Sequence, residues 1–176
     1  MAVFAASFTV SQSADCSTLT FVDTSNYVGN DSGLNINSFT TREYLVSNSD
    51  SQLIATIPLT GGALSGTYAL SADAWLSVEL NLELALNTPP TAYVETHSVL
   101  STCYLEKCYA ELVANTECGC GCDGGSCSCA NSTSNDKVRL LEYIKAAEIF
   151  AEYSNPVLSQ KQLDAGTALC DSNQNN

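Results

Sequence analysis

The clearest pattern of apolar and polar residues lies between Trp75 and Leu86. Leucine or valine stands at each even position from 76 to 86, and Ser, Glu or Asn stands at the odd positions from 77 to 83. A period of two buries one face of an extended strand, whereas a helix would distribute these leucines around its axis. This segment therefore predicts a β-strand with one face in a core.

Six shorter segments before and after it show β-forming residues bounded by clusters of Gly, Asn, Asp and Pro. They are residues 7–10, 17–23, 38–46, 52–59, 66–70 and 91–100. Turn residues at intervals of about ten positions are typical of domains built from short antiparallel strands. We therefore predict a fold that is mainly β with α, in which residues 1–101 form an immunoglobulin-like β-sandwich domain.

The period of the apolar residues changes to three and four after Thr102. Leu105, Cys108, Tyr109 and Leu112 then mark one face of a short helix. The Cys- and Gly-rich stretch that follows predicts a loop by its composition. Residues 102–134 are accordingly predicted to be a short helix and a Cys-rich junction.

The C-terminal part predicts two helices. The first starts at a capping residue, Ser134, Asn135 or Asp136. Its apolar stripe consists of Leu140, Leu141, Ile144, Ala147 and Phe150. Pro156 opens the second helix, because proline is favoured in the first turn. Residues 135–176 are thus expected to form a helical hairpin joined by "SNP", followed by the polar tail "DSNQNN".

Composition and charge narrow the classes of function. Of the 176 residues 45% are hydrophobic and 14% are charged, which is typical of a folded domain and not of a disordered acidic segment. The net charge is −13, and Arg42 is the only basic residue among residues 1–100. Nucleic acid and anionic membranes both need a basic face, so we expect neither as a direct partner. No segment approaches the ~20 apolar residues that span a bilayer.

The nine cysteines raise three alternatives, because five of them crowd into "ECGCGCDGGSCSCA", residues 117–130. Zinc is one, although the C-x-C spacings fit a zinc knuckle poorly. The candidate ligands are Cys103, Cys108, Cys118, Cys120, Cys122, Cys127 and Cys129. Disulfides are another, pairing Cys103 or Cys108 with the loop or Cys170 with the helix junction. We expect no export signal at the N-terminus, and a reducing cytoplasm would favour the third alternative, small reduced thiols that pack as apolar residues.

Catalytic chemistry has little support in the sequence. His97 is the only histidine, and alternation in its strand places it on the same face as Tyr93, Glu95 and Val99. A general base formed with Glu95 is one hypothesis, but a strand histidine with structural partners is the one that we favour. Nucleophile, phosphate-binding and metalloprotease motifs are absent from the sequence. We therefore expect a protein that is not an enzyme, with no catalytic and no cofactor-binding residues.

Several segments of the chain resemble a known family of virion proteins. They are "FTVSQSADCSTLTFVDTSNY" (residues 8–27), "AYVETHSVLSTCYLEKCYAELVA" (92–114), the Cys-rich junction and the ending "AGTALC" (165–170). The chain is similar in this layout to the neck ring proteins that accompany the portal and tail in crAss-like bacteriophages and related tailed phages of Bacteroidota hosts.

The resemblance implies a virion structural protein that is made in the host cytoplasm and contains no catalytic residue. It implies a homo-oligomeric ring, twelvefold by portal symmetry, that contacts the portal and the adjacent neck and tail rings. Two alternatives from other classes remain. One is a small zinc-binding module on a sandwich carrier. The other is a head-fibre or adhesin protein that recognises sugars through loop aromatics such as Tyr27, Tyr68 and Trp75.

Overall fold

The structure is a computed structural model that describes residues 4–27, 34–84, 91–114 and 132–174. The chain divides into two compact units. The first consists of residues 1–71 and 75–99 and contains the strands, and the second consists of residues 72–74 and 100–176 and contains the helices. The fold is therefore mixed, with two antiparallel sheets of seven strands in all and three helices in the described part.

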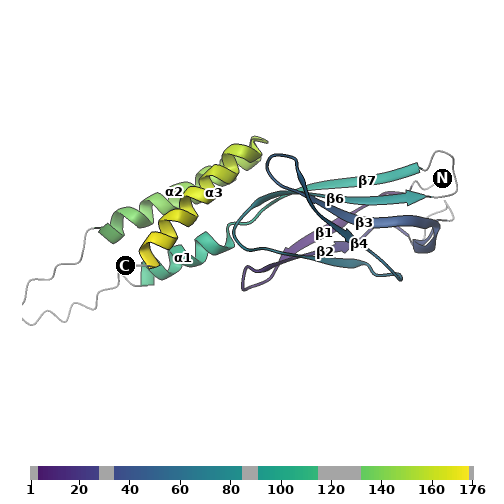
Figure 1. Ribbon diagram of the computed structural model, residues 1–176, viewed down its shortest axis with the longest axis horizontal. Coiled ribbons are helices and arrows are strands. Elements are labelled where there is room, and N and C mark those ends of the chain that lie inside the picture. Colours follow the sequence, from purple (N-terminus) through teal and green to yellow (C-terminus); the bar gives the residue numbers. More distant parts are fainter. Residues whose placement is uncertain (1–3, 28–33, 85–90, 115–131, 175–176) are drawn as a thin grey trace, which may run out of the picture. The chain divides into compact units, whose positions relative to one another are not determined.

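The seven strands form two sheets in the first unit (Figure 1). The three-stranded sheet has the order β1-β2-β5, and the four-stranded sheet has the order β4-β3-β6-β7. The strands are β1 (Phe8–Gln12), β2 (Thr18–Asp23), β3 (Phe39–Ser47), β4 (Leu53–Pro58), β5 (Ser65–Ala69), β6 (Trp75–Leu84) and β7 (Thr91–Leu100). A short 3-10 helix, Ile36–Ser38, precedes β3. Each segment that the sequence predicts to be extended overlaps one of these strands, although the bounds of β1, β3 and β5 differ by one or two residues.

The inner faces of the two sheets meet in an aromatic core. β6 buries every even residue from Leu76 to Leu84, as its period of two predicts, and it pairs with β3. Tyr44 of β3 is completely buried, and its ring centre lies 5.5 Å from Phe8 of β1 and 5.2 Å from Phe21 of β2. Such aromatic contacts bury large apolar areas. Tyr44 therefore joins the four-stranded sheet to the three-stranded one.

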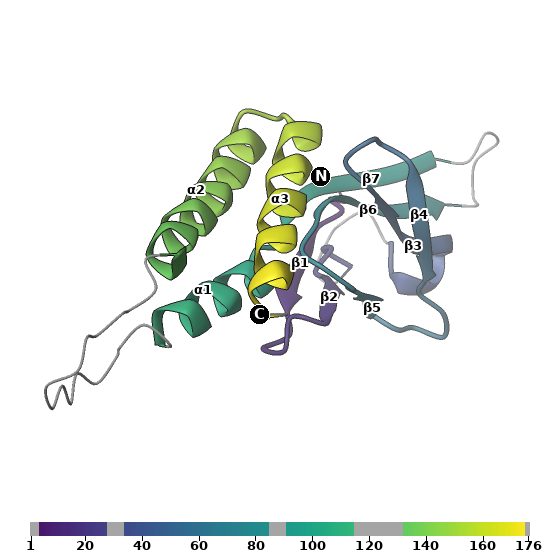
Figure 2. The same cartoon turned by 60° about the vertical axis from the view of Figure 1, so that its left-hand side comes forward.

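The second unit contains α1 (Cys103–Ala114), α2 (Ser132–Glu152) and α3 (Pro156–Gln174). In Figures 1 and 2 α2 and α3 lie side by side, and all three helices share one core. The core consists of Leu105, Cys108, Leu112, Leu140, Ile144, Ala147, Leu163 and Cys170. No helix in the described ranges is long and apolar enough to cross a membrane.

The helix bounds differ from the predicted ones at two places. α2 already begins at Ser132, before the predicted capping residues. α3 begins at Pro156 as predicted, but it continues to Gln174, so most of the predicted polar tail is helical. Ser172 and Asn173 both donate side-chain hydrogen bonds to the carbonyl of Leu169. These bonds satisfy a carbonyl near the end of the helix, where carbonyls lack helical partners.

Asp73 caps the first turn of α1. It lies in the segment 72–74, which belongs to the helical unit although it connects β5 to β6. Its carboxylate accepts hydrogen bonds from the backbone N–H groups of Tyr104 (3.1 Å) and Leu105 (2.9 Å) and from the hydroxyl of Ser101 (2.7 Å). The N–H groups of the first turn have no partner within the helix, and a negative charge at this end also interacts favourably with the helix dipole. A buried carboxylate therefore stabilises the start of α1.

Gly166 of α3 gives a test of the helical core. A Cβ atom at this position would lie 2.8 Å from Leu105 Cδ1 and 3.5 Å from Leu140 Cδ1. Both leucines are fully buried and cannot move away freely. We expect Gly166→Ala to lower the free energy of unfolding by about 1–2 kcal/mol, despite the better helix propensity of alanine.

Chemical denaturation followed by circular dichroism measures this change. Lys161→Ala is the matched control, because Lys161 is an exposed position of the same helix. We expect it to change stability by no more than about 0.5 kcal/mol. A Gly166→Ala protein as stable as this control would contradict the close contact of the three helices.

Candidate functional site

A buried ion pair lies where the two sheets meet. Asp23 ends β2, and Arg42 lies in β3. Arg42 Nη2 is 3.2 Å from Asp23 Oδ2, and the two side chains are only 5% and 0% exposed. The same nitrogen donates to the carbonyl of Ala63 at 2.9 Å, and Asp23 Oδ1 accepts from the N–H of Ser25 at 2.9 Å. A buried charge needs such partners because it has lost its water.

Tyr27 completes this cluster. Its hydroxyl donates to Asp23 Oδ2 at 2.6 Å, and Arg42 Nε donates to the same hydroxyl at 3.4 Å. The guanidinium also lies over the Tyr27 ring, 5.6 Å from its centre. Burial, and then the hydrogen bond to Asp23, raise the pKa of Tyr27 to about 12. The phenol therefore keeps its proton at neutral pH and acts as a hydrogen-bond donor.

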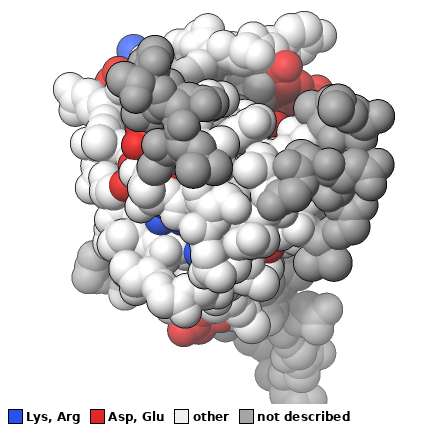
Figure 3. All heavy atoms as spheres, turned by 90° about the vertical axis from the view of Figure 1, so that its right-hand side faces the viewer, with Lys and Arg blue, Asp and Glu red and all other residues white. Residues whose placement is uncertain are grey.

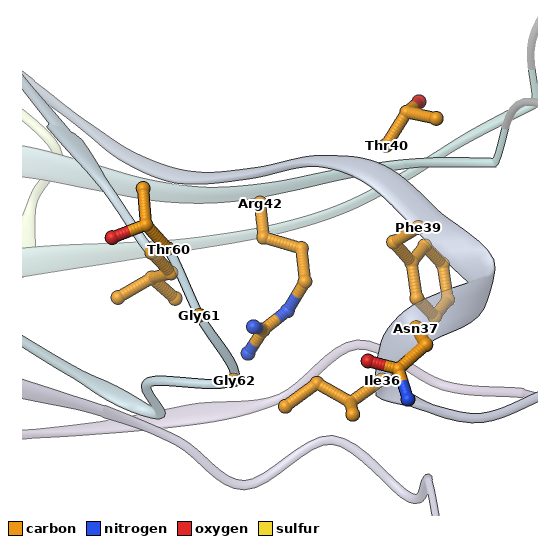
Figure 4. A pocket seen from close by; sticks show the side chains of 9 residues that line it. Ile36, Asn37, Phe39, Thr40, Arg42, Thr60, Gly61 and Gly62 are labelled. Carbon is orange, nitrogen blue, oxygen red and sulfur yellow. The ribbon is translucent and has the colours of Figure 1, made fainter.

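A pocket of about 410 Å³ opens beside Arg42 (Figure 4). Its lining consists of Ile36, Asn37, Phe39, Thr40, Arg42, Leu59, Thr60, Gly61 and Gly62. In Figure 4 the Arg42 side chain extends from β3 toward Gly62. Gly61 and Gly62 have φ angles of 59° and 80°, which favour glycine and shape this wall.

The chemistry that this pocket offers is hydrogen bonding. Arg42 is the only charged residue in the described lining, and Asp23 balances that charge. The polar side chains of Asn37, Thr40 and Thr60 line the same pocket. General acid–base catalysis needs a group whose pKa lies near the working pH. The described lining supplies donors and acceptors for a neutral polar group and no such acid or base.

His97 has the surroundings of a strand histidine. Its Nε2 lies 3.1 Å from Glu95 Oε1, and its ring stacks on Phe8 at a centre-to-centre distance of 4.2 Å. Tyr93, Glu95, His97 and Val99 are all partly buried and alternate with exposed residues along β7. The shared face that the sequence predicts is therefore confirmed. Both partners of the imidazole, Glu95 and Phe8, are residues of the packed strands.

The cysteines differ from the expected reduced thiols. Cys108 of α1 and Cys170 of α3 form a disulfide with a Cα–Cα distance of 6.3 Å, and both residues are buried. Cys16 and Cys103 are also disulfide-bonded. The reduced-thiol interpretation is wrong for these four residues. The disulfide alternative is confirmed for these four residues, but the predicted pairing of Cys108 with the loop is wrong, because Cys108 pairs with Cys170 in the helical core.

The predicted zinc ligands fall into two groups. Cys103 and Cys108 are disulfide-bonded, and a disulfide sulfur offers no thiolate to a metal. The other candidates, Cys118, Cys120, Cys122, Cys127 and Cys129, lie outside the described residues. Within the described ranges no group of three or more His, Cys, Asp or Glu side chains could hold a metal ion. Zinc binding by the loop stays a prediction.

The aromatic residues suggested for sugar binding do not form a loop surface. Trp75 is the first residue of β6 and only 9% exposed, and Tyr68 lies within β5. Tyr27 belongs to the Asp23–Arg42 cluster. The expectation that these three are loop aromatics is wrong for Tyr68 and Trp75. The alternation of apolar and polar residues around Tyr68 and Trp75 predicts strands, and this signal could have shown that the two residues do not lie in loops.

A second apolar stripe on α2 faces outward. Of the predicted stripe, Leu140, Ile144 and Ala147 are buried, whereas Leu141 and Phe150 are only partly buried. The outward stripe consists of Val138, Leu141 and Ile149 of α2, with Lys145 between them, and continues to Tyr153 just after the helix ends; these residues are spaced by three or four positions. Val138, Ile149 and Tyr153 are 57%, 51% and 80% exposed. A helix with apolar stripes on two sides is typical of one that has a second neighbour. The sequence analysis missed this stripe, although its spacing is visible in the sequence.

Comparison with known proteins adds no name to this site. No protein-family model, no curated protein and no solved structure matches the chain.

The ion pair gives a stability prediction. We expect Asp23→Ala to lower the free energy of unfolding by about 3–5 kcal/mol, because it leaves the Arg42 guanidinium buried without its counter-charge. The double variant Asp23→Leu/Arg42→Met, which removes both charges, is expected to lose less. Asp50→Ala is the control, since Asp50 is an exposed acid of the same unit. Equal losses for Asp23→Ala and Asp50→Ala in urea denaturation would contradict the buried pair.

Tyr27 gives a prediction of pH dependence. Its pKa is higher in the folded protein, about 12, than the ordinary value of 10.0. The stability that this shift contributes is complete below about pH 10, the unfolded pKa, and is lost as the pH rises through the folded pKa. Tyrosinate absorbance should show a step near pH 12 that Tyr27→Phe removes. A Tyr27→Phe protein that loses tyrosinate absorbance near pH 10 and keeps the step near pH 12 would contradict this assignment.

Proposed function

We propose that this protein is a non-enzymatic structural protein of a bacteriophage virion, where it forms a ring in the neck or connector between portal and tail. The proposal starts from the resemblance of residues 8–27, 92–114 and 165–170 to the neck ring proteins of crAss-like phages. The observation that carries it is the outward stripe of α2, Val138 to Tyr153, which leaves large apolar side chains in solvent. Surfaces of this kind mark sites of protein–protein contact.

The strand order supports an immunoglobulin-like interpretation of the first unit. In immunoglobulin constant domains strands A, B and E are neighbours in one sheet and C, F and G in the other. The orders β1-β2-β5 and β3-β6-β7 correspond to these neighbours. β4 departs from that pattern, because it pairs with β3 and not with β5. A sandwich of this type is a rigid carrier on which a ring can be built.

A helical hairpin is the matching interpretation of the second unit. α2 and α3 are joined by residues 153–155, and Asn155 accepts a hydrogen bond from the N–H of Leu158 at 3.2 Å. The hydroxyl of Ser159 donates to the carbonyl of Ala147 at 2.8 Å and joins the two helices. Since Ala147 belongs to the buried stripe, the outward stripe of α2 stays free for a neighbouring subunit.

The proposal predicts that the purified chain assembles. We expect a closed ring with twelvefold symmetry, or a complex with the portal, because each subunit has an apolar surface to bury. Mass photometry and electron-microscopic class averages measure the copy number and the symmetry. A strictly monomeric protein that binds no portal or neck component would contradict the proposal.

A pair of variants separates assembly from folding. Val138→Ser/Ile149→Ser removes two apolar side chains of the outward stripe and should abolish assembly while the circular dichroism spectrum stays unchanged. Val157→Ser is the matched control, because Val157 is an exposed valine of α3 outside the stripe. The control protein should still assemble. If the wild type, the double variant and the control form rings equally well, the outward stripe is not part of the contact between subunits.

A further inference from the structure

We propose that the groove between α1 and α2 binds the outer face of the four-stranded sheet of a second copy of this chain. This inference rests on the proposed ring function and names the two surfaces that would meet. Three observations support it: the groove has an apolar and basic lining, the sheet face carries acidic side chains, and the charges on the two surfaces are similarly spaced.

The groove combines apolar side chains with two lysines. It has a volume of about 420 Å³ and is lined by Tyr109 of α1 and by Lys137, Val138, Leu141, Glu142 and Lys145 of α2. Neither lysine has an ion-pair partner within the described ranges. Val138 and Leu141 belong to the outward stripe, so this groove is the part of the stripe that carries positive charge. Its chemistry suits a partner with carboxylates beside apolar residues.

The outer face of the four-stranded sheet carries the complementary charge. β3 and β6 bury Tyr44, Val46, Leu80 and Leu82, so Glu43, Glu79 and Glu83 point to the opposite side. Glu43 accepts a hydrogen bond from Asn81, and Glu83 accepts one from Thr41. None of the three carboxylates has a basic partner in the described part of the chain. Arg42, the only base among residues 1–100, is buried on the inner side.

Apolar side chains accompany these carboxylates. Tyr93 and His97 of β7 contact Phe4 and Phe8 in the core, so the alternating residue Val94 lies on the outer face. Val94 is 49% exposed. Figure 3 views the molecule from one end, and there the described side chains are mainly uncharged, with scattered acidic groups and few basic ones. The sheet face therefore offers the mixture of acidic and apolar groups that the groove requires.

The spacing of the charges matches on the two surfaces. Lys137 and Lys145 are eight residues apart on α2, which is about 12 Å along a helix axis. Glu79 and Glu83 are four residues apart on β6, which is about 13 Å along a strand. A helix laid along β6 of a second copy can therefore bring both lysines to both carboxylates at once.

The contact joins two different surfaces and is therefore heterologous. A heterologous contact repeats from copy to copy, and it closes into a ring when its rotation divides a full turn. A twofold dimer can also satisfy it, but only if both groove-to-sheet contacts form within the same pair of chains. The inference is thus consistent with a ring, and the copy number of the assembly separates a ring from such a reciprocal dimer.

Charge reversal on each surface tests the contact. The groove variant is Lys137→Glu/Lys145→Glu, and the sheet variant is Glu79→Lys/Glu83→Lys. Each should associate about tenfold or more weakly than the wild type, because like charges then face each other. An equimolar mixture of the two variants should assemble again, since both contacts of an alternating ring are then complementary. Light scattering after size-exclusion chromatography measures all four samples.

The controls separate local from general effects of charge. Lys107→Glu/Lys161→Glu makes the same change in net charge at two exposed lysines outside the groove, and it should assemble like the wild type. If a reversal variant does not fold, the neutral variants Lys137→Gln/Lys145→Gln and Glu79→Gln/Glu83→Gln replace it. Both should weaken assembly and reduce its dependence on salt.

The outcomes distinguish this inference from the proposed function. A folded wild-type protein that never self-associates overturns the ring and the contact together. A wild-type ring that is insensitive to both reversal variants overturns only the contact. The same holds if both variants fail to assemble and their mixture fails as well, because the two surfaces then do not meet each other.

Discussion

The ion pair between Asp23 and Arg42 is the constraint on which the sheet unit depends. Asp23 ends β2 and Arg42 lies within β3, so the two sheets can meet only if both charges leave water together. The hydroxyl of Tyr27 and the carbonyl of Ala63 supply the remaining partners. A buried pair of this kind adds little net stability, but a broken one is costly. We infer that it selects the alignment of the sheets, while the aromatic core around Tyr44 supplies most of the stability.

The helical unit is organised by a different set of contacts. Asp73 caps α1 although it lies 31 and 32 residues before the N–H groups that it binds, and a disulfide of 62-residue separation joins Cys108 to Cys170. The chain passes between the two units after residues 71, 74 and 99.

Most strands could be predicted because alternation is a local signal. The alternating pattern of β6 is contained in its own ten residues, and it was sufficient to predict that the even positions are buried. The helices were found for the same reason, although the start of α2 was placed too late and the end of α3 too early. Capping residues are common in this Ser- and Asn-rich chain, so they mark a helix end poorly.

The interactions that join distant residues could not be predicted in this way. Arg42 was recognised as the only base of its region, but nothing in the sequence pairs it with Asp23. Asp73 lies in a short turn, and its partners begin 28 residues later. The pairing of Cys108 with Cys170 follows from helix packing, while compartment arguments favoured reduced thiols. The outward stripe of α2 was not predicted, because a single apolar stripe was sufficient to predict a helix in this segment.

The central claim is that this chain is a structural subunit whose helical groove holds the sheet face of its neighbour. Zero-length carbodiimide cross-linking of an assembly made from equal amounts of isotope-labelled and unlabelled chains tests it most directly. The account predicts peptides that join Lys137 or Lys145 to Glu79 or Glu83, with one labelled and one unlabelled partner. Cross-links between chains that involve other surfaces and never this set would contradict it.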